Sequence, residues 1–308
     1  MLKSTFGWLA TLALLVLTLT GCGEDDDNQI DNSQRSLAEI AANDGRFTVL
    51  SSLLERVDLD DVLDGTGPFT VFAPTDAAFG QIELDGLSDA EVRQILLYHV
   101  ISGLDLPAAD LSEGQTLVGT GSTGGPNGSQ LTLLVEKNGA AVTVNNEASV
   151  VQADIGGTNG TIHAVNQVLF AQSLVDFVTK LNGFSALATA LTDASLVPAL
   201  QADGPFTVFA PNDAAFAAAA GTIATLTPDQ VADVLRYHVI AGANVRAEDV
   251  MDGSVSTLLG QSVGLSATAN NAVTVMDAQG NSVAVLNANI QASNGVIHGI
   301  GSVLIPQL

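Results

Sequence analysis

The sequence predicts an α+β protein made of two tandem copies of one domain. Three short motifs recur in the same order in the two halves of the chain. Within each half, apolar residues at helical spacing come first, and short strand-like runs with turn signals follow. The chain has 308 residues, of which 47% are hydrophobic, so each copy can bury a core of its own. Disorder of the whole chain is thereby excluded.

The repeat rests on three pairs of segments. Residues 67–79 read GPFTVFAPTDAAF and residues 204–216 read GPFTVFAPNDAAF. A Tyr-His pair follows in each copy, and an Asn-Gly-x-Ile-His segment closes each copy. Because order and spacing are nearly the same twice, we infer two tandem domains.

Helices and one strand are expected in the first half of each copy. In copy one, apolar residues at mixed helical spacing predict helices within residues 37–59. The apolar run 69–72 predicts a buried strand that ends at Pro74, and Asp76 is the expected N-cap of a short helix.

Capping boxes predict a further helix in each copy. The box at residues 88–91 opens a helix that runs into the Tyr-His pair, and residues 227–230 form the same box with Pro228 at the first helical position. In copy two, the alanine-rich residues 214–220 predict a longer helix than copy one has at the same place.

The second half of each copy is expected to form hairpins. Residues 131–135 and 141–144 flank Asn138-Gly139, which is typical of a type I′ turn. Residues 273–276 and 283–286 form the corresponding pair around Gln279-Gly280.

The motifs resemble those of the fasciclin family, which carries a Thr-Val-Phe-Ala-Pro segment, a Tyr-His pair and a final Asn-Gly-Ile-His segment. The matching residues of copy one are Thr70, Phe72, Pro74, Tyr98, His99, Asn159, Gly160 and His163. Those of copy two are Thr207, Phe209, Pro211, Tyr237, His238, Asn294, Gly295 and His298. The resemblance implies two domains, at 34–171 and 172–308, each a small β-sandwich wedged against a cluster of helices. It also implies that these residues are structural, with a possible part in interactions.

All four histidines fall inside the motifs. One interpretation pairs His99 with His163, and His238 with His298, as metal ligands or catalytic groups. The other, which we favour, is that each ring is buried and hydrogen-bonded. No Asp or Glu stands at equivalent places beside both final histidines to complete a zinc site. We therefore expect no metal, no cofactor and no catalytic residue.

Other chemistry-bearing patterns are weak. Residues 119–124 match a dinucleotide-binding pattern, but residues 125–129 predict a flexible loop where that pattern needs a helix. The acidic residues 58–64 lack the Gly and Glu positions of a calcium loop.

Charge limits the class of partner. The chain carries 33 acidic and 9 basic residues, for a net charge of −24. Nucleic-acid binding needs clustered Lys and Arg, so a nucleic-acid partner is excluded. We expect a monomer, because like-charged copies repel one another.

The first 33 residues indicate where in the cell the protein is located. Lys3 precedes an apolar run at residues 6–19, which is too short for a membrane span. Residues 19–22, Leu-Thr-Gly-Cys, resemble the lipobox of bacterial lipoproteins, and Cys22 is the only cysteine. The resemblance implies a signal peptide at 1–21, lipidation of Cys22 and attachment to the membrane through that lipid. Residues 22–33 then form an acidic tether, which is either a plain spacer or a surface-export signal.

Together these features predict a non-enzymatic outer-membrane lipoprotein of a bacterial cell envelope. The family resemblance implies adhesion modules that contact an unknown protein or glycan on cells or in a matrix. Whether the protein faces the cell surface or the periplasm stays open. The alternatives are a periplasm-facing protein that binds a small ligand, and a metal-assisted hydrolase that uses the paired histidines.

Overall fold

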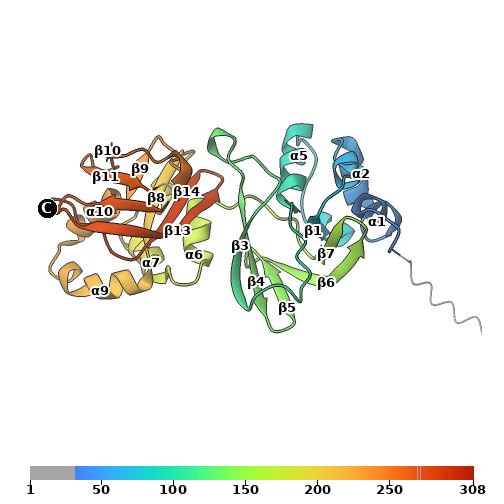
Figure 1. Ribbon diagram of the computed structural model, residues 1–308, viewed down its shortest axis with the longest axis horizontal. Helices are drawn as coiled ribbons and strands as arrows, with labels where there is room; N and C mark the ends of the chain where they lie inside the picture. Colours follow the sequence, from blue (N-terminus) through green and yellow to red (C-terminus); the bar gives the residue numbers. More distant parts are fainter. Residues whose placement is uncertain (1–31, 269, 271) are drawn as a thin grey trace, which may run out of the picture. The chain divides into compact units, whose positions relative to one another are not determined.

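The structure is a computed structural model that describes residues 32–268, 270 and 272–308. The predicted signal peptide, Cys22 and most of the acidic tether lie outside the described residues. Residues Asn32–Leu308 form one compact unit that holds both copies of the repeat, called domain 1 and domain 2 below (Figure 1).

Domain 1 begins with helices and ends with strands. Its helices are α1 (Leu37–Asn43), α2 (Thr48–Arg56), α3 (Asp60–Leu63), α4 (Asp76–Phe79) and α5 (Asp89–Tyr98), with a 3-10 turn at Pro126–Gly128. Its strands are β1 (Phe69–Pro74), β2 (Val100–Ser102), β3 (Gly114–Gly119), β4 (Thr132–Asn138), β5 (Ala141–Val144), β6 (Ala148–Gly157) and β7 (Gly160–Val165).

Domain 2 repeats this order. Its helices are α6 (Leu174–Lys180), α7 (Ser185–Asp193), α8 (Val197–Leu200), α9 (Asp213–Ile223) and α10 (Pro228–Tyr237), with a 3-10 turn at Ala247–Asp249. Its strands are β8 (Phe206–Pro211), β9 (Val239–Ala241), β10 (Gly253–Ser256), β11 (Ser262–Ala267), β12 (Val273–Met276), β13 (Ser282–Ala292) and β14 (Gly295–Ile300).

Each domain has a seven-stranded sheet with the same topology. The order is β2-β1-β7-β6-β5-β4-β3 in domain 1 and β9-β8-β14-β13-β12-β11-β10 in domain 2. The first motif strand pairs in parallel with the last strand, β1 with β7 and β8 with β14, and all other pairs are antiparallel. The first and third motifs of each copy therefore lie side by side.

The sheet folds over on itself at a bulge. β6 shifts register twice against β7, and Asp154 within it has a φ of 60°. Phe72 of β1 then packs in one cluster with Leu133 of β4 and Val144 of β5, although these strands are far apart in the sheet order. The α+β class and the wedge of sheet and helices are thus confirmed.

A second core lies between the sheet and the helices. In domain 1, side chains of α1, α2 and α5 pack on the β1–β7 face, and Figure 1 shows these helices on one side of the domain. Burial of this apolar surface at about 25 cal/mol per Å² is what holds the short helices in place.

The predicted capping boxes are both present. Ser88 and Glu91 exchange their hydrogen bonds at the start of α5, and Thr227 and Gln230 do so at the start of α10. The N-cap prediction for Asp76 is wrong. Thr75 caps α4 instead, because the carboxylate of Asp76 accepts hydrogen bonds from Thr48 Oγ1 and the backbone N–H of Val49.

The longer helix in copy two is confirmed, since α9 has 11 residues and α4 has 4. The type I′ turn is wrong: the β4–β5 loop is Gly139-Ala140, and only Gly139 has a positive φ, of 61°. That arrangement matches a type II′ turn, which places glycine first.

Candidate functional site

The first-motif threonine joins its strand to a loop. Thr70 is fully buried; its hydroxyl donates to the carbonyl of Leu104 at 2.9 Å and accepts from the N–H of Leu106 at 2.9 Å. Thr207 makes the same two bonds in domain 2. A hydroxyl used twice in this way holds the loop and is not free to act as a nucleophile.

The histidine of the Tyr-His pair ends its helix. His99 is 1% exposed; its Nδ1–H donates to the carbonyl of Ile95 at 2.8 Å, and its Nε2 accepts from the N–H of Leu169 at 2.8 Å. Burial lowers the pKa of His99 to about 4, and the bond to Ile95 opposes this only in part. His238 has the same environment and a pKa also lowered to about 4 by burial.

The histidine of the final motif forms hydrogen bonds to the backbone of the bulge and of a neighbouring loop. The Nε2–H of His163 donates to the carbonyl of Leu106 at 2.9 Å, and its Nδ1 accepts from the N–H of Asp154 at 3.3 Å. His298 does the same with Val245 and with Asn289, whose φ of 62° marks the bulge of β13. Phe72 and Phe209 stack on these two rings at 5.4 Å and 5.7 Å between centroids.

The asparagine of the final motif ties three segments together. Asn159 Oδ1 accepts from the N–H of Leu37 at 3.0 Å, and its Nδ2 donates to the carbonyls of Leu63 and Gly65 at 2.6 and 2.7 Å. Asn294 makes the three equivalent bonds in domain 2. The neighbouring glycines allow close approach of strands, since a Cβ on Gly160 or Gly295 would overlap the carbonyl oxygen of Phe69 or Phe206.

The motif tyrosine fixes the end of its helix against the sheet. The hydroxyl of Tyr98 donates to the carbonyl of Thr132 at 3.0 Å and accepts from Asn145 Nδ2 at 3.1 Å. Burial raises its pKa. In domain 2 the hydroxyl of Tyr237 donates to the carbonyl of Ser262 at 2.8 Å. The motif prolines, Pro74 and Pro211, are the last residues of their strands and lie opposite Val165 and Ile300.

The motif residues thus lie close together in each domain, as scaffold contacts. Each of the four rings has both nitrogens bonded to backbone groups, which leaves no lone pair for a metal. Within residues 32–268, 270 and 272–308, no three His, Cys, Asp or Glu side chains converge as metal ligands would. Across the same part of the chain, every helix is too short or too polar to cross a membrane.

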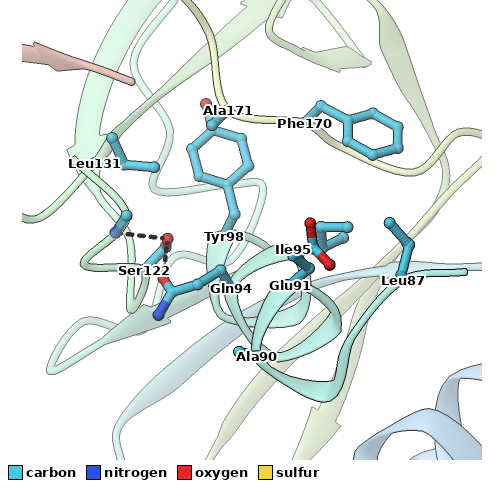
Figure 2. Close-up of a pocket in the computed structure, with 11 residues that line it drawn as sticks. Leu87, Ala90, Glu91, Gln94, Ile95, Tyr98, Ser122, Leu131, Phe170 and Ala171 are labelled. Atoms are coloured by element: carbon cyan, nitrogen blue, oxygen red, sulfur yellow. Dashed lines mark hydrogen bonds between the residues drawn. The ribbon is translucent and has the colours of Figure 1, made fainter. Parts of the chain in front are cut away.

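An apolar pocket of about 590 Å³ lies beside α5 in domain 1 (Figure 2). The helix and the turn before it provide one wall with Leu87, Ala90, Glu91, Gln94, Ile95 and Tyr98. Ser122, Gly124 and Leu131 of the β3–β4 loop form the opposite wall. Phe170 and Ala171 close a third side, and Phe170 is 45% exposed.

Few polar groups face this pocket. The hydroxyl of Ser122 donates to Gln94 Oε1 at 2.8 Å and accepts from the N–H of Gly124 at 3.3 Å, as Figure 2 shows. Glu91 is the one charged lining residue. Its hydrogen bonds from the side chain and backbone of Ser88 lower its pKa, so it is ionised at neutral pH.

The loop that walls the pocket was predicted to be flexible, and the structure shows it anchored. Thr120 and Ser122 are buried, and the N–H of Gly121 donates to the carbonyl of Val100 at 2.6 Å. At its other end the loop contacts domain 2, where Asn244 Nδ2 donates to Ser129 Oγ at 3.1 Å. The sequence signal that could have indicated this site is the length difference between the copies. Residues 120–131 join β3 to β4, but only residues 257–261 join β10 to β11.

A scan against family models matches the fasciclin domain twice, at residues 45–171 and 182–306. Protein sll1483 of Synechocystis is 38% identical over 143 residues, which are 45% of this chain and 76% of that protein. Human periostin is 29% identical over 274 residues, which are 85% of this chain and 30% of periostin. The chain therefore spans under a third of periostin.

Among solved structures, a FAS1 domain pair from the insect cell adhesion molecule fasciclin I is similar. The match has a TM-score of 0.56 and covers 85% of this chain and 97% of that chain, at 18% identity. At this identity the likeness concerns the fold, and it extends over a pair of domains.

Proposed function

The chain belongs to the fasciclin domain family, and from that premise we propose that it is a non-enzymatic, lipid-anchored protein of a bacterial cell envelope. Its two domains serve as adhesion modules that contact a protein or glycan on another cell or in a matrix. Two linked modules bind with avidity where both reach their partner at once.

The use of the motif residues carries this proposal. The polar side chains of the repeated motifs form hydrogen bonds to backbone groups inside each domain, so they stabilise a scaffold. The accessible feature is a surface pocket with apolar walls, which suits binding better than bond cleavage. The insect relative is itself described as a cell adhesion molecule.

The anchor is proposed from the sequence. Diacylglycerol on Cys22, together with an acylated amino group, would hold the chain on the membrane, because several acyl chains anchor stably where one does not. The acidic residues that follow would keep the modules in solution away from the lipid.

The test is protease treatment of intact cells that carry either the wild type or Cys22→Ala, with detection of the full-length chain. We expect the wild type to be cleaved on intact cells and Cys22→Ala to leave the membrane fraction. A surface-attachment assay of a deletion strain follows, with wild type restored in trans as the control. Unchanged attachment after deletion would contradict the adhesion role.

A second candidate is a periplasm-facing protein that binds a small ligand. The observation in its favour is the pocket volume, which lies in the range of small-molecule sites. Protection of the anchored wild type on intact cells, with cleavage after the outer membrane is opened, would favour it.

A further inference from the structure

We propose that the pocket beside α5 binds a bulky apolar side chain of a protein partner, and that lysine or arginine flanks this side chain in the partner. This inference rests on the proposed contact function and names where and how the contact is made. It assigns the site to domain 1 alone.

The shape and lining of the pocket indicate an apolar anchor. Its volume of about 590 Å³ exceeds that of any single side chain, so an aromatic ring can enter with part of its backbone. The exposed part of Phe170 is apolar surface that the described fold leaves in contact with water. A ring placed against Phe170 and Leu131 would remove that surface from water, and aromatic anchors in pockets carry much of the energy of protein interfaces.

Charge selects the flanking residues of the partner. Glu91 is exposed at the pocket, and no cation lines it. Two arginines of the same region already have partners: Arg56 pairs with Asp89 at the start of α5, and Arg93 of α5 donates to the carbonyl of Val57. With a chain charge of −24, an acidic segment is repelled and a basic one is attracted.

The pocket is formed before a partner arrives. Hydrogen bonds hold the 120–131 loop to Val100, Gln94 and, through Ser129, to Asn244 of domain 2. A site whose walls are already fixed loses little conformational entropy on binding. Ser122 uses Gln94 Oε1, and within the described residues Gln94 Nε2 has no hydrogen-bond partner, so it is available to a carbonyl of the bound segment.

Domain 2 differs at the same place. Its shorter 257–261 loop replaces the wall that Ser122, Gly124 and Leu131 provide in domain 1. On the helix, Asp229 and Asp233 stand where α5 has Ala90 and Gln94, and Asp233 pairs with Arg236. The apolar site is therefore a property of the first copy.

Three labelled peptides test the inference against the purified full chain carrying Cys22→Ala. They are Lys-Arg-Trp-Arg-Lys, the same peptide with serine for tryptophan, and Glu-Asp-Trp-Asp-Glu. Fluorescence polarisation in moderate salt gives the three affinities. We expect the basic tryptophan peptide to bind at least tenfold more tightly than either of the others, a difference of about 1.4 kcal/mol.

Two variants locate the contact. Ala90→Trp places a ring in the pocket from an exposed position on α5 and removes no buried contact. It should therefore weaken the binding of the basic tryptophan peptide at least tenfold. Met251→Trp is the control, because Met251 is 83% exposed in domain 2 and the substitution adds the same ring. Glu91→Gln keeps a residue that can form the capping box. It should weaken the binding of the basic tryptophan peptide roughly threefold and make that binding less dependent on salt.

Equal affinity of the basic tryptophan peptide for the wild type and for Ala90→Trp overturns the inference. It is also overturned if the serine peptide or the acidic peptide binds the wild type as tightly as the basic tryptophan peptide, or if none of the three peptides binds. The attachment assay separates the two proposals. If deletion lowers attachment but Ala90→Trp does not, the adhesion role stands and the pocket inference falls.

Discussion

The N–H of Leu169 donates a 2.8 Å hydrogen bond to Nε2 of His99, although 70 residues separate them in the chain. Leu304 and His238 repeat this contact at 2.9 Å. Because Nδ1–H of each ring donates to a helix carbonyl, Nε2 can accept only while the ring is neutral. Protonation would replace this bond by two facing donors.

The free energy of unfolding should therefore decrease as the pH is lowered, because of these two histidines. Their native pKa is lowered to about 4 from 6.5, so the neutral form stabilises the fold above pH 6.5. As pH drops from 6.5 to 4, the unfolded chain binds protons that the native chain does not, at a cost of roughly 3 kcal/mol per histidine. Urea midpoints across this range measure the sum. NMR titration of the ring protons measures each histidine directly, and a midpoint near 6.5 for either would contradict the prediction.

Asn159→Ala should destabilise domain 1 by about 2–4 kcal/mol. The substitution leaves the N–H of Leu37 and the carbonyls of Leu63 and Gly65 without their partner. Denaturant unfolding followed by circular dichroism gives the free energy. Asn43→Ala is the control, because its side chain bonds only within the exposed end of α1, and it should change stability by under about 0.5 kcal/mol. A similar loss of unfolding free energy in both variants would contradict the role given to the Asn159 hydrogen bonds.

Gly160→Ala should cost at least about 3 kcal/mol. Gly160 has a φ of 148°, and a Cβ there would overlap the carbonyl oxygen of Phe69 where β1 and β7 begin to pair. Gly156→Ala is the matched control, since it lies on the neighbouring strand with nothing within 4 Å of the added Cβ. Thermal unfolding of the two variants decides; equal midpoints would show that the strands can move apart.

Thr132→Val should weaken the contact between the two domains. Thr132 Oγ1 accepts from the buried N–H of Gln291 at 2.9 Å, and Leu134 of the same strand packs into the core of domain 2. An isosteric valine keeps the volume and leaves that N–H unpaired, at about 1–3 kcal/mol. We expect the wild type to unfold in one transition and the variant to show a split or broadened one. Thr143→Val, on β5, is the control that should leave the transition single.

The sequence predicted the parts of the fold that depend on neighbouring residues. The boxes at Ser88 and Thr227 lie within one helical turn, so their residue types are enough to identify them. The same applies to the length of α9, which follows from its alanines.

Predictions failed where a distant partner decides. Asp76 has the composition of an N-cap, but its carboxylate is engaged by α2, 28 residues earlier. The pocket could not be predicted for a similar reason. Its wall is a glycine-rich segment that looks flexible by composition, and bonds to the distant residues Val100, Gln94 and Asn244 hold it in place.

The pairing of the first strand with the last has a consequence for synthesis. β14 lies between β13 and β8, so the middle of the domain 2 sheet is missing until residue 300 has left the ribosome. Domain 1 can close as soon as β7 is made. A nascent chain therefore carries a finished first domain beside an open second one, whose β8 edge is unpaired for the whole translation of residues 212–294. Over that interval the β14-facing edge of β8 is open to pairing with a wrong strand, and only the synthesis of residues 295–300 closes it.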